Sequence, residues 1–104
     1  KNSFESFKVL SGLDYETLAD ALGVSAKTLQ RKEVFDTGQS EKLYQLADLY
    51  AIGITYFGRD GFRRWMERPL FSLGNRVPLD LIDVSEGISL LKTEIMRLHH
   101  GIAV

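Results

Sequence analysis

The sequence has 104 residues, of which 44% are hydrophobic and 26% charged, and it contains no cysteine. This composition is typical of one soluble domain with its own core, and it excludes disordered chains, disulfide frameworks and cysteine-based zinc sites or nucleophiles. No apolar run approaches the roughly 20 residues that cross a bilayer, so we expect a cytoplasmic protein with no membrane partner. The formal net charge is −1, and the first 50 residues hold six Lys or Arg against eight Asp or Glu. Any nucleic-acid binding therefore requires a local basic patch.

The first elements are predicted to be helices separated by a short interruption. Phe4, Phe7 and Leu10 recur at helical spacing and indicate a short first helix, which the sequence SGLD interrupts. Asp14 ends that interruption and is placed to cap the helix that follows.

The stretch YETLADALGVSAKTLQRKE predicts a helix, a tight turn and a second helix. A helix-turn-helix requires a small residue where the helices approach, a glycine at the turn and apolar residues that clamp the second helix. Ala19, Gly23 and the surrounding leucines and valine meet these needs, and Ser25 is placed to cap the second helix. The alternative is a plain helical hairpin with a solvated basic end, which the acidic first half favours.

On the helix-turn-helix interpretation, the second helix would enter a major groove. Lysine and arginine side chains contact phosphates or guanine there, and glutamine reads adenine. The candidate DNA-binding residues are Ser25, Lys27, Thr28, Gln30, Arg31 and Lys32.

A longer amphipathic helix is predicted over residues 38–57, after candidate caps at Asp36 and Thr37. Its apolar positions are Leu43, Leu46, Ala47, Tyr50 and Ile54. We expect a homodimer for two reasons. A helix-turn-helix protein commonly reads two half-sites, and this stripe, with the phenylalanines of the first helix, is more apolar surface than one short helix covers.

The second half begins with a short helix, FRRWMERP, which Pro69 should end near Arg68. The following PLFSLGNRVPLDLIDVSEG contains both prolines and cannot form one helix or strand, yet it is too apolar for a flexible linker. It is therefore an ordered connection packed on helices, or one face of a partner site.

The closing helix is expected to begin at a capping box formed by Asp83 and Glu86 and to end at Gly101. Its packed side is predicted to consist of Ile88, Leu91, Ile95 and Leu98. These elements together predict an all-α fold.

Nearly the whole chain resembles the Xre/MbcA/ParS family of bacterial antitoxins, which accompany RES-domain toxins. The resemblance is carried by GLDYETLADALGVSAKTLQRKE, SEKLYQLADLY, YFG, FRRWMERPLFSLGNRVPLDLIDVSEG and a helix ending LHHG. It implies that residues 1–57 form an Xre-like helix-turn-helix domain for dimerisation or operator binding. Residues 58–104 would form a toxin-binding domain. Val84 stands where the family often has a capping threonine, so the resemblance leaves that role to Asp83 or Ser85.

The resemblance also implies how the chain would act. The family's toxins consume or transfer the ADP-ribose part of NAD, and its antitoxins cover the active-site entrance, largely with the C-terminal domain and tail. The apolar tail GIAV ends in a carboxylate, which is negatively charged like the phosphates of NAD, so the tail would occupy the toxin's NAD entrance. The alternative is that the tail is only the frayed end of the last helix. The implied toxin-binding residues are Arg64, Pro69, Leu73, Gly74, Pro78, Leu79, His100, Gly101, Ile102, Ala103 and Val104.

Several residues have competing interpretations. Trp65 is assigned mainly to the core, with an interface role as the alternative. The basic cluster of Arg59, Arg63, Arg64 and Arg68 is either a solvated face or a contact for an acidic partner.

No catalytic residue, cofactor or metal is predicted. The adjacent His99 and His100 diverge on a helix and have no cysteine or third histidine beside them. The sequence has no nucleophile elbow, phosphate loop or paired carboxylates, so we do not expect an enzyme. The alternatives to an antitoxin are a stand-alone transcription regulator, whose C-terminal half dimerises or senses a ligand, and a helical adaptor that does not contact DNA.

Overall fold

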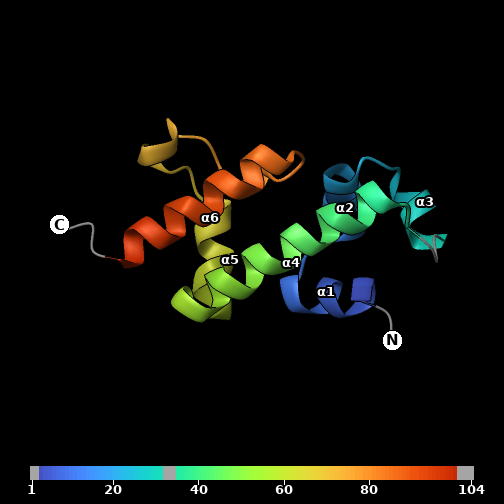
Figure 1. The fold of residues 1–104 in the computed structure, drawn as a ribbon, viewed down its shortest axis with the longest axis horizontal. Helices are drawn as coiled ribbons and strands as arrows, with labels where there is room; N and C mark the ends of the chain where they lie inside the picture. The colour runs from blue at the N-terminus through green and yellow to red at the C-terminus, as the bar shows by residue number, and fades with distance from the viewer. Residues whose placement is uncertain (1–2, 32–34, 101–104) are drawn as a thin grey trace.

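The longest element, α4 (Thr37–Phe57), runs diagonally through the molecule and contacts helices from both halves of the chain (Figure 1). The structure is a computed structural model, and it describes residues 3–31 and 35–100. Within these residues the only extended pairing is an isolated bridge between Leu70 and Arg76, so the predicted all-α class is confirmed. The other elements are α1 (Ser3–Ser11), α2 (Tyr15–Leu22), α3 (Ala26–Arg31), α5 (Arg59–Glu67), the 3-10 helices η1 (Phe71–Leu73) and η2 (Pro78–Leu81), and α6 (Ser85–His99).

The first three predicted caps are confirmed. The Asp14 carboxylate accepts a hydrogen bond from the Thr17 backbone N–H at 2.8 Å, and this bond lowers the pKa of Asp14. Ser25 Oγ accepts from the Thr28 N–H at 3.1 Å. Asp36 forms a reciprocal capping box with Gln39, with bonds of 2.8 and 3.1 Å. Each cap satisfies a backbone donor that the first turn of a helix would otherwise leave unpaired.

The capping box predicted for the last helix is wrong. The N-cap of α6 is Val84, and no side chain caps it. The helix begins one residue later than a box formed by Asp83 and Glu86 would require. Near this start, Gly87 packs directly against the backbone of Leu81. The Asp83 carbonyl accepts instead from Lys42 Nζ, at 2.6 Å.

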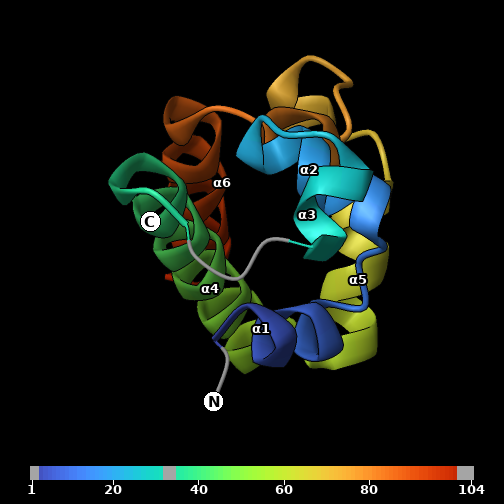
Figure 2. The same cartoon turned by 90° about the vertical axis from the view of Figure 1, so that its right-hand side faces the viewer.

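The apolar stripe of α4 is covered within this one chain. Helix α6 packs along α4, and Figure 2 shows the two running side by side. Tyr50 meets Phe7 and Phe62 edge-on, with ring centroids 5.2 and 4.9 Å apart, and burial raises the pKa of the Tyr50 phenol, which stays neutral.

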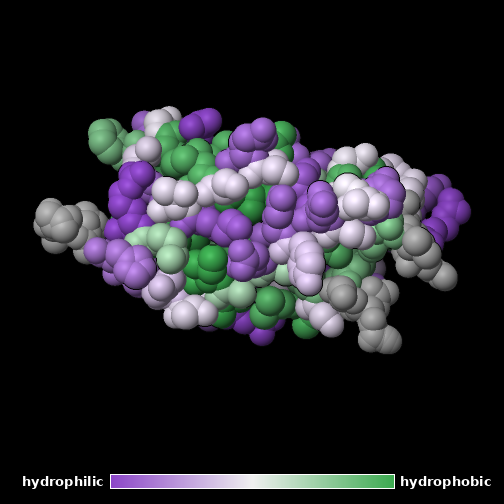
Figure 3. Space-filling view, in the orientation of Figure 1, coloured by the Kyte–Doolittle hydropathy of each residue, from purple (hydrophilic) through white to green (hydrophobic). Residues whose placement is uncertain are grey.

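Two predictions about apolar surface are corrected by this packing. Phe4 and Phe7 do not remain exposed for a second copy, because they are buried against the rings of Tyr15, Phe35 and Tyr50. The α4 stripe is covered by α5 and α6, which pack on α4. On the face in Figure 3, hydrophobic surface appears in separate patches. Leu98 is 49% exposed although Leu91 and Ile95 are fully buried, so the packed side of α6 ends before Leu98.

Three basic side chains join the N-terminal and C-terminal halves. Lys42 Nζ donates to the carbonyl of Ala21 at 2.8 Å as well as to that of Asp83. Arg59 Nη2 donates to the Val9 carbonyl at 2.8 Å, near the C-terminus of α1. The guanidinium of Arg63 lies against Gly12, whose positive φ of 72° forms the turn after α1. These residues therefore hold the two halves in one packed unit.

The molecule is elongated, measuring 47 × 26 × 23 Å. Helix α3 lies at one end, and the C-terminal end of α6 lies at the other (Figure 1). Within residues 3–31 and 35–100, none of the helices combines the length and the apolar character that a membrane span requires.

Candidate functional site

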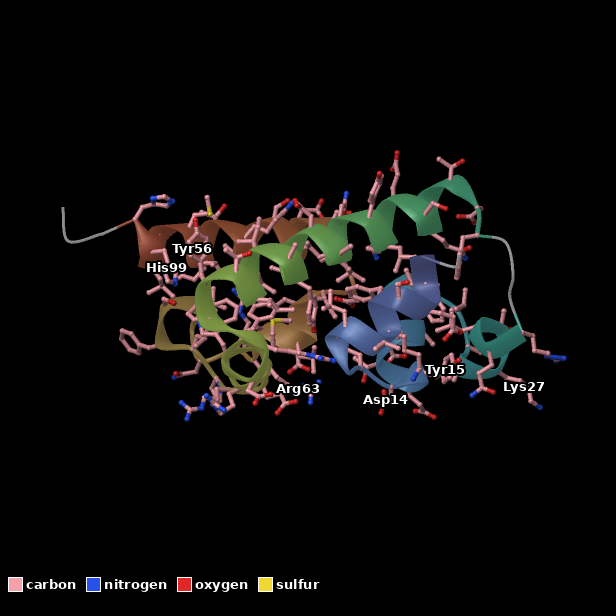
Figure 4. The ribbon with its side chains drawn as sticks, turned by 90° about the horizontal axis from the view of Figure 1, so that it is seen from below. Asp14, Tyr15, Lys27, Tyr56, Arg63 and His99 are labelled. Carbon is pink, nitrogen blue, oxygen red and sulfur yellow. The ribbon has the colours of Figure 1, made fainter. Side chains whose placement is uncertain are left out.

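Helix α3 presents three polar side chains on one face. Leu29 is buried and anchors the helix on α2, while Lys27, Gln30 and Arg31 are exposed. Residues spaced by three and four positions share one face of a helix, so these three lie together, opposite Leu29. Lys27 points away from the rest of the protein in Figure 4. Their amide and cationic groups are the kinds that contact base edges and phosphates.

The other candidate DNA contacts lie at the start of α3 or outside the described residues. Ser25 Oγ donates to Thr28 Oγ1 at 2.8 Å while capping the helix, so its hydroxyl serves the fold. Ser25 and Thr28 are both exposed beside the face that carries Lys27. Lys32 lies outside the described residues.

The turn between α2 and α3 has the geometry that the sequence predicted. Gly23 adopts a φ of 77°, which glycine tolerates without strain. Its N–H donates to the carbonyl of Asp20, and the N–H of Val24 donates to that of Ala19 at 3.0 Å. These bonds close α2 and direct the chain into α3, so the predicted helix, turn and helix are confirmed.

The predicted toxin-binding residues between Pro69 and Leu79 divide into exposed and buried groups. Pro69 and Gly74 are exposed and Leu79 is half-buried. Leu73 and Pro78 are buried and shape the segment from within. The segment is an ordered connection packed on the helices, and its exposed residues lie on the surface.

Phe71 is a residue of this segment that sequence reasoning missed. It is 91% exposed, while its neighbours Leu70 and Leu73 pack against or within the core. The pair Gly74 and Asn75 signals a tight turn, because both residues tolerate positive φ. That signal does not reveal which of the three apolar side chains points outward.

The C-terminal end of α6 is held by aromatic contacts. The His99 ring stacks on Tyr56, with centroids 4.1 Å apart, and meets Phe57 edge-on at 5.3 Å. Figure 4 shows Tyr56 and His99 together at the end opposite Lys27. Trp65 stacks on Phe57 at 5.5 Å and packs against the core, as predicted.

The remaining candidate toxin contacts lie near this end or outside the described residues. Arg64 is exposed on α5, and His100 is exposed with its N–H donating to the Met96 carbonyl at 2.9 Å. Residues 101–104, which hold the candidates Gly101, Ile102, Ala103 and Val104, lie outside the described residues. Across residues 3–31 and 35–100, no group of three or more His, Asp or Glu side chains could hold a metal ion.

Two family models divide the chain between them. Residues 3–48 match the antitoxin Xre-like helix-turn-helix domain, and residues 53–101 match the antitoxin Xre/MbcA/ParS C-terminal toxin-binding domain. The chain belongs to the Xre/MbcA/ParS antitoxin family. Helix α3 of this antitoxin thus lies in the first match, and the segment after Pro69 and all of α6 lie in the second.

A solved structure has a similar fold. A chain in the crystal structure of the M. tuberculosis MbcT-MbcA toxin-antitoxin complex superimposes with a TM-score of 0.77 and 23% sequence identity. The similarity covers 98% of the antitoxin described above and 95% of that chain. No curated protein sequence matches.

Proposed function

We propose that this antitoxin neutralises a RES-domain toxin that acts on NAD, by binding it and covering its active-site entrance. The observation that carries the proposal is the match of residues 53–101 to the family's toxin-binding domain. On this proposal the chain acts by binding and is not itself an enzyme. Copurification with the product of the adjacent gene tests the partner. A neighbouring protein that is no RES toxin, or one that does not copurify, would contradict the proposal.

The tail is proposed to be the blocking element. Stacking of His99 on Tyr56 holds the C-terminal end of α6 against α4. The apolar side chains of Ile102 and Val104 and the terminal carboxylate would occupy the site where the toxin admits NAD. The exposed surface from Pro69 to Leu79 would hold the toxin beside the tail.

Deleting residues 100–104 is expected to restore the toxin's NAD turnover while leaving a folded protein that still associates weakly. The deleted residues follow α6, whose buried side chains Leu91 and Ile95 are retained. Turnover is measured against antitoxin concentration, and circular dichroism checks the fold. A deletion of Lys1 and Asn2 at the other end serves as control. If the chain without its tail inhibits at the same concentration as the full chain, the surface around Pro69 and Leu79 becomes the blocking element.

We also propose that the antitoxin represses its own operon by placing α3 in a major groove. The proposal is supported by the shared face of Lys27, Gln30 and Arg31 within a helix-turn-helix. Because the chain carries little net charge, this local patch must supply the attraction to phosphates.

Arg31→Ala is expected to weaken operator binding by about 1 to 3 kcal/mol, the range for losing a bidentate contact to guanine. Binding of the wild type should fall as salt rises, because contacts to phosphate release counterions. A mobility-shift assay on the upstream DNA measures both effects. Arg97→Ala is the control, since Arg97 is an exposed arginine on α6. The repressor role fails if the wild type, alone and with toxin, binds the upstream DNA no better than random duplex.

We propose that the operator-binding form is a homodimer, because a helix-turn-helix protein commonly reads two half-sites. Its interface would have to lie outside the apolar stripe of α4, which α6 already covers. Light scattering should give a dimer mass at micromolar concentration. A monomer mass in both the free and the toxin-bound state would contradict this proposal.

A further inference from the structure

Phe71 is the most exposed of the large hydrophobic side chains in the described residues. Its exposed fraction is 91%, against 79% for Tyr44 and 70% for Val9. Tyr44 carries a hydroxyl that water can solvate, but the phenylalanine ring has no polar atom. Single exposed hydrophobic residues are common on protein surfaces. Exposure alone therefore does not assign a role to Phe71. The backbone around Phe71 is also unusual, because it forms a closed loop.

The loop that carries Phe71 is closed by its own hydrogen bonds. The Leu70 N–H donates to the Arg76 carbonyl at 3.1 Å, and the Asn75 N–H donates back to the Leu70 carbonyl at 2.8 Å. Inside this bridge the Leu73 N–H donates to Leu70 and the Gly74 N–H donates to Phe71, both at 3.0 Å. Arg76 Nε adds a bond to the Leu73 carbonyl at 2.9 Å.

The loop is also anchored to the protein beneath it. Leu73 is buried, and Leu70 packs against the core. Gly74 and Asn75 turn the chain with φ values of 70° and 64°. The backbone of Phe71 is thus already ordered in the free protein. Association then loses less conformational entropy than it would with a flexible loop, so burial of the ring contributes more fully to affinity.

Arginines flank Phe71 on both sides along the chain, while the nearest acidic residues, Glu67 and Asp80, lie just outside the loop. From Arg68 to Leu79 the only ionisable side chains are Arg68 and Arg76, and both are exposed. An aromatic side chain with flanking arginines has the composition of an interface hot spot, in which a desolvated ring fills a pocket and charges lie at the rim. The complementary surface is an apolar pocket with carboxylates around it.

We propose that Phe71 is the anchor of the toxin interface, and that its ring inserts into an apolar pocket of the toxin whose carboxylates face Arg68 and Arg76. This inference rests on the proposed antitoxin function. The toxin is the chosen occupant because the loop lies wholly within the match to the toxin-binding domain. In Figure 1 the loop (gold) projects at the end away from α3, and hydrophobic surface projects there in Figure 3. A toxin seated on Phe71 would leave α3 uncovered.

The test compares two exposed aromatic residues by titration calorimetry with the purified toxin. Phe71→Ala is expected to raise the Kd by at least about tenfold, in line with the loss of a hot-spot aromatic. Phe71→Leu should retain part of the affinity, because it keeps apolar volume. Tyr44→Ala is the matched control, since Tyr44 lies in the helix-turn-helix match and its loss should leave the Kd unchanged. All three variants should melt at the wild-type temperature, because the substituted side chains are exposed.

The outcomes separate this inference from the proposed function. If the wild type binds no toxin, the proposed function fails, and the anchor role fails with it. If the wild type binds and Phe71→Ala binds equally well, only the anchor role fails. If Phe71→Ala keeps its toxin affinity but converts a dimer to a monomer, Phe71 is a contact between copies and the inference is overturned.

The carboxylates proposed around the toxin's pocket have a separate test. Arg68→Glu should slow association with the toxin several-fold at low salt, and added salt should reduce the difference, because attraction between exposed charges is screened. Arg68 is the better choice of the two, since the Arg76 side chain also bonds the loop. An association rate that stays unchanged at low salt would remove the carboxylate rim from the proposal.

Discussion

Leu91→Ala is expected to destabilise the protein by about 2 to 5 kcal/mol, the range for removing a fully buried leucine. Leu91 is 0% exposed and lies on the side of α6 that packs against α4. Truncation removes buried apolar surface and leaves a cavity that two packed helices cannot readily close. Chemical denaturation followed by circular dichroism measures the loss.

Leu98→Ala provides the matched comparison on the same helix. Leu98 lies two turns after Leu91 and is 49% exposed. We expect its truncation to change stability by less than about 1 kcal/mol, as for most surface substitutions. Equal losses from the two variants would contradict the difference in burial between Leu98 and Leu91.

Gly87→Ala is expected to destabilise the protein by about 3 kcal/mol, although alanine ordinarily favours a helix. A Cβ at this position would overlap the carbonyl oxygen of Leu81 and lie 2.9 Å from its carbonyl carbon. Backbone atoms cannot move aside by changing rotamer, so the start of α6 would have to separate from η2. Urea denaturation gives the change in the free energy of unfolding.

Gly38→Ala is the control for that substitution. Gly38 also lies in a helix, α4, and an added Cβ would meet only Asp36 Oδ1, at an ordinary 3.7 Å. We expect a gain of about 0.5 to 1 kcal/mol, because glycine loses more conformational freedom than alanine on folding. A Gly87→Ala protein as stable as Gly38→Ala would show that η2 and α6 do not pack as closely as described.

The features that the sequence predicted correctly are local ones. Asp14, Ser25 and Asp36 each cap a backbone donor three residues away, and the Gly23 N–H bonds to carbonyls three and four residues before it. The spacing of apolar residues likewise predicts where helices form, because it indicates which side chains of one segment share a face. Both partners of such interactions lie within a few residues of each other, so the interactions can be inferred from the sequence of that short segment.

The features that were predicted wrongly depend on packing between elements, which the sequence pattern of one element does not specify. The capping box predicted at the start of α6 is absent, and Gly87 there packs against the backbone of Leu81, a contact that rules about capping residues do not contain. The apolar stripe of α4 suggested a homodimer because the spacing of apolar residues does not indicate which element covers the helix face. In the structure that element is α6, which lies far along the same chain. Whether Leu70, Phe71 or Leu73 points outward is decided in the same way, by where the loop meets the core.

The continuity of α4 has a consequence for the lifetime in a cell of the two proposed activities, toxin inhibition and operator repression. This one helix contributes core residues such as Leu46 on the helix-turn-helix side and Gly53 on the toxin-binding side. A protease cut that released α6 would expose the α4 face that α6 covers, and both halves would lose core packing together. Degradation should therefore free the toxin and the operator in a single event, without leaving a repressor fragment. Limited proteolysis monitored in parallel by toxin inhibition and mobility shift should give the same time course for both losses.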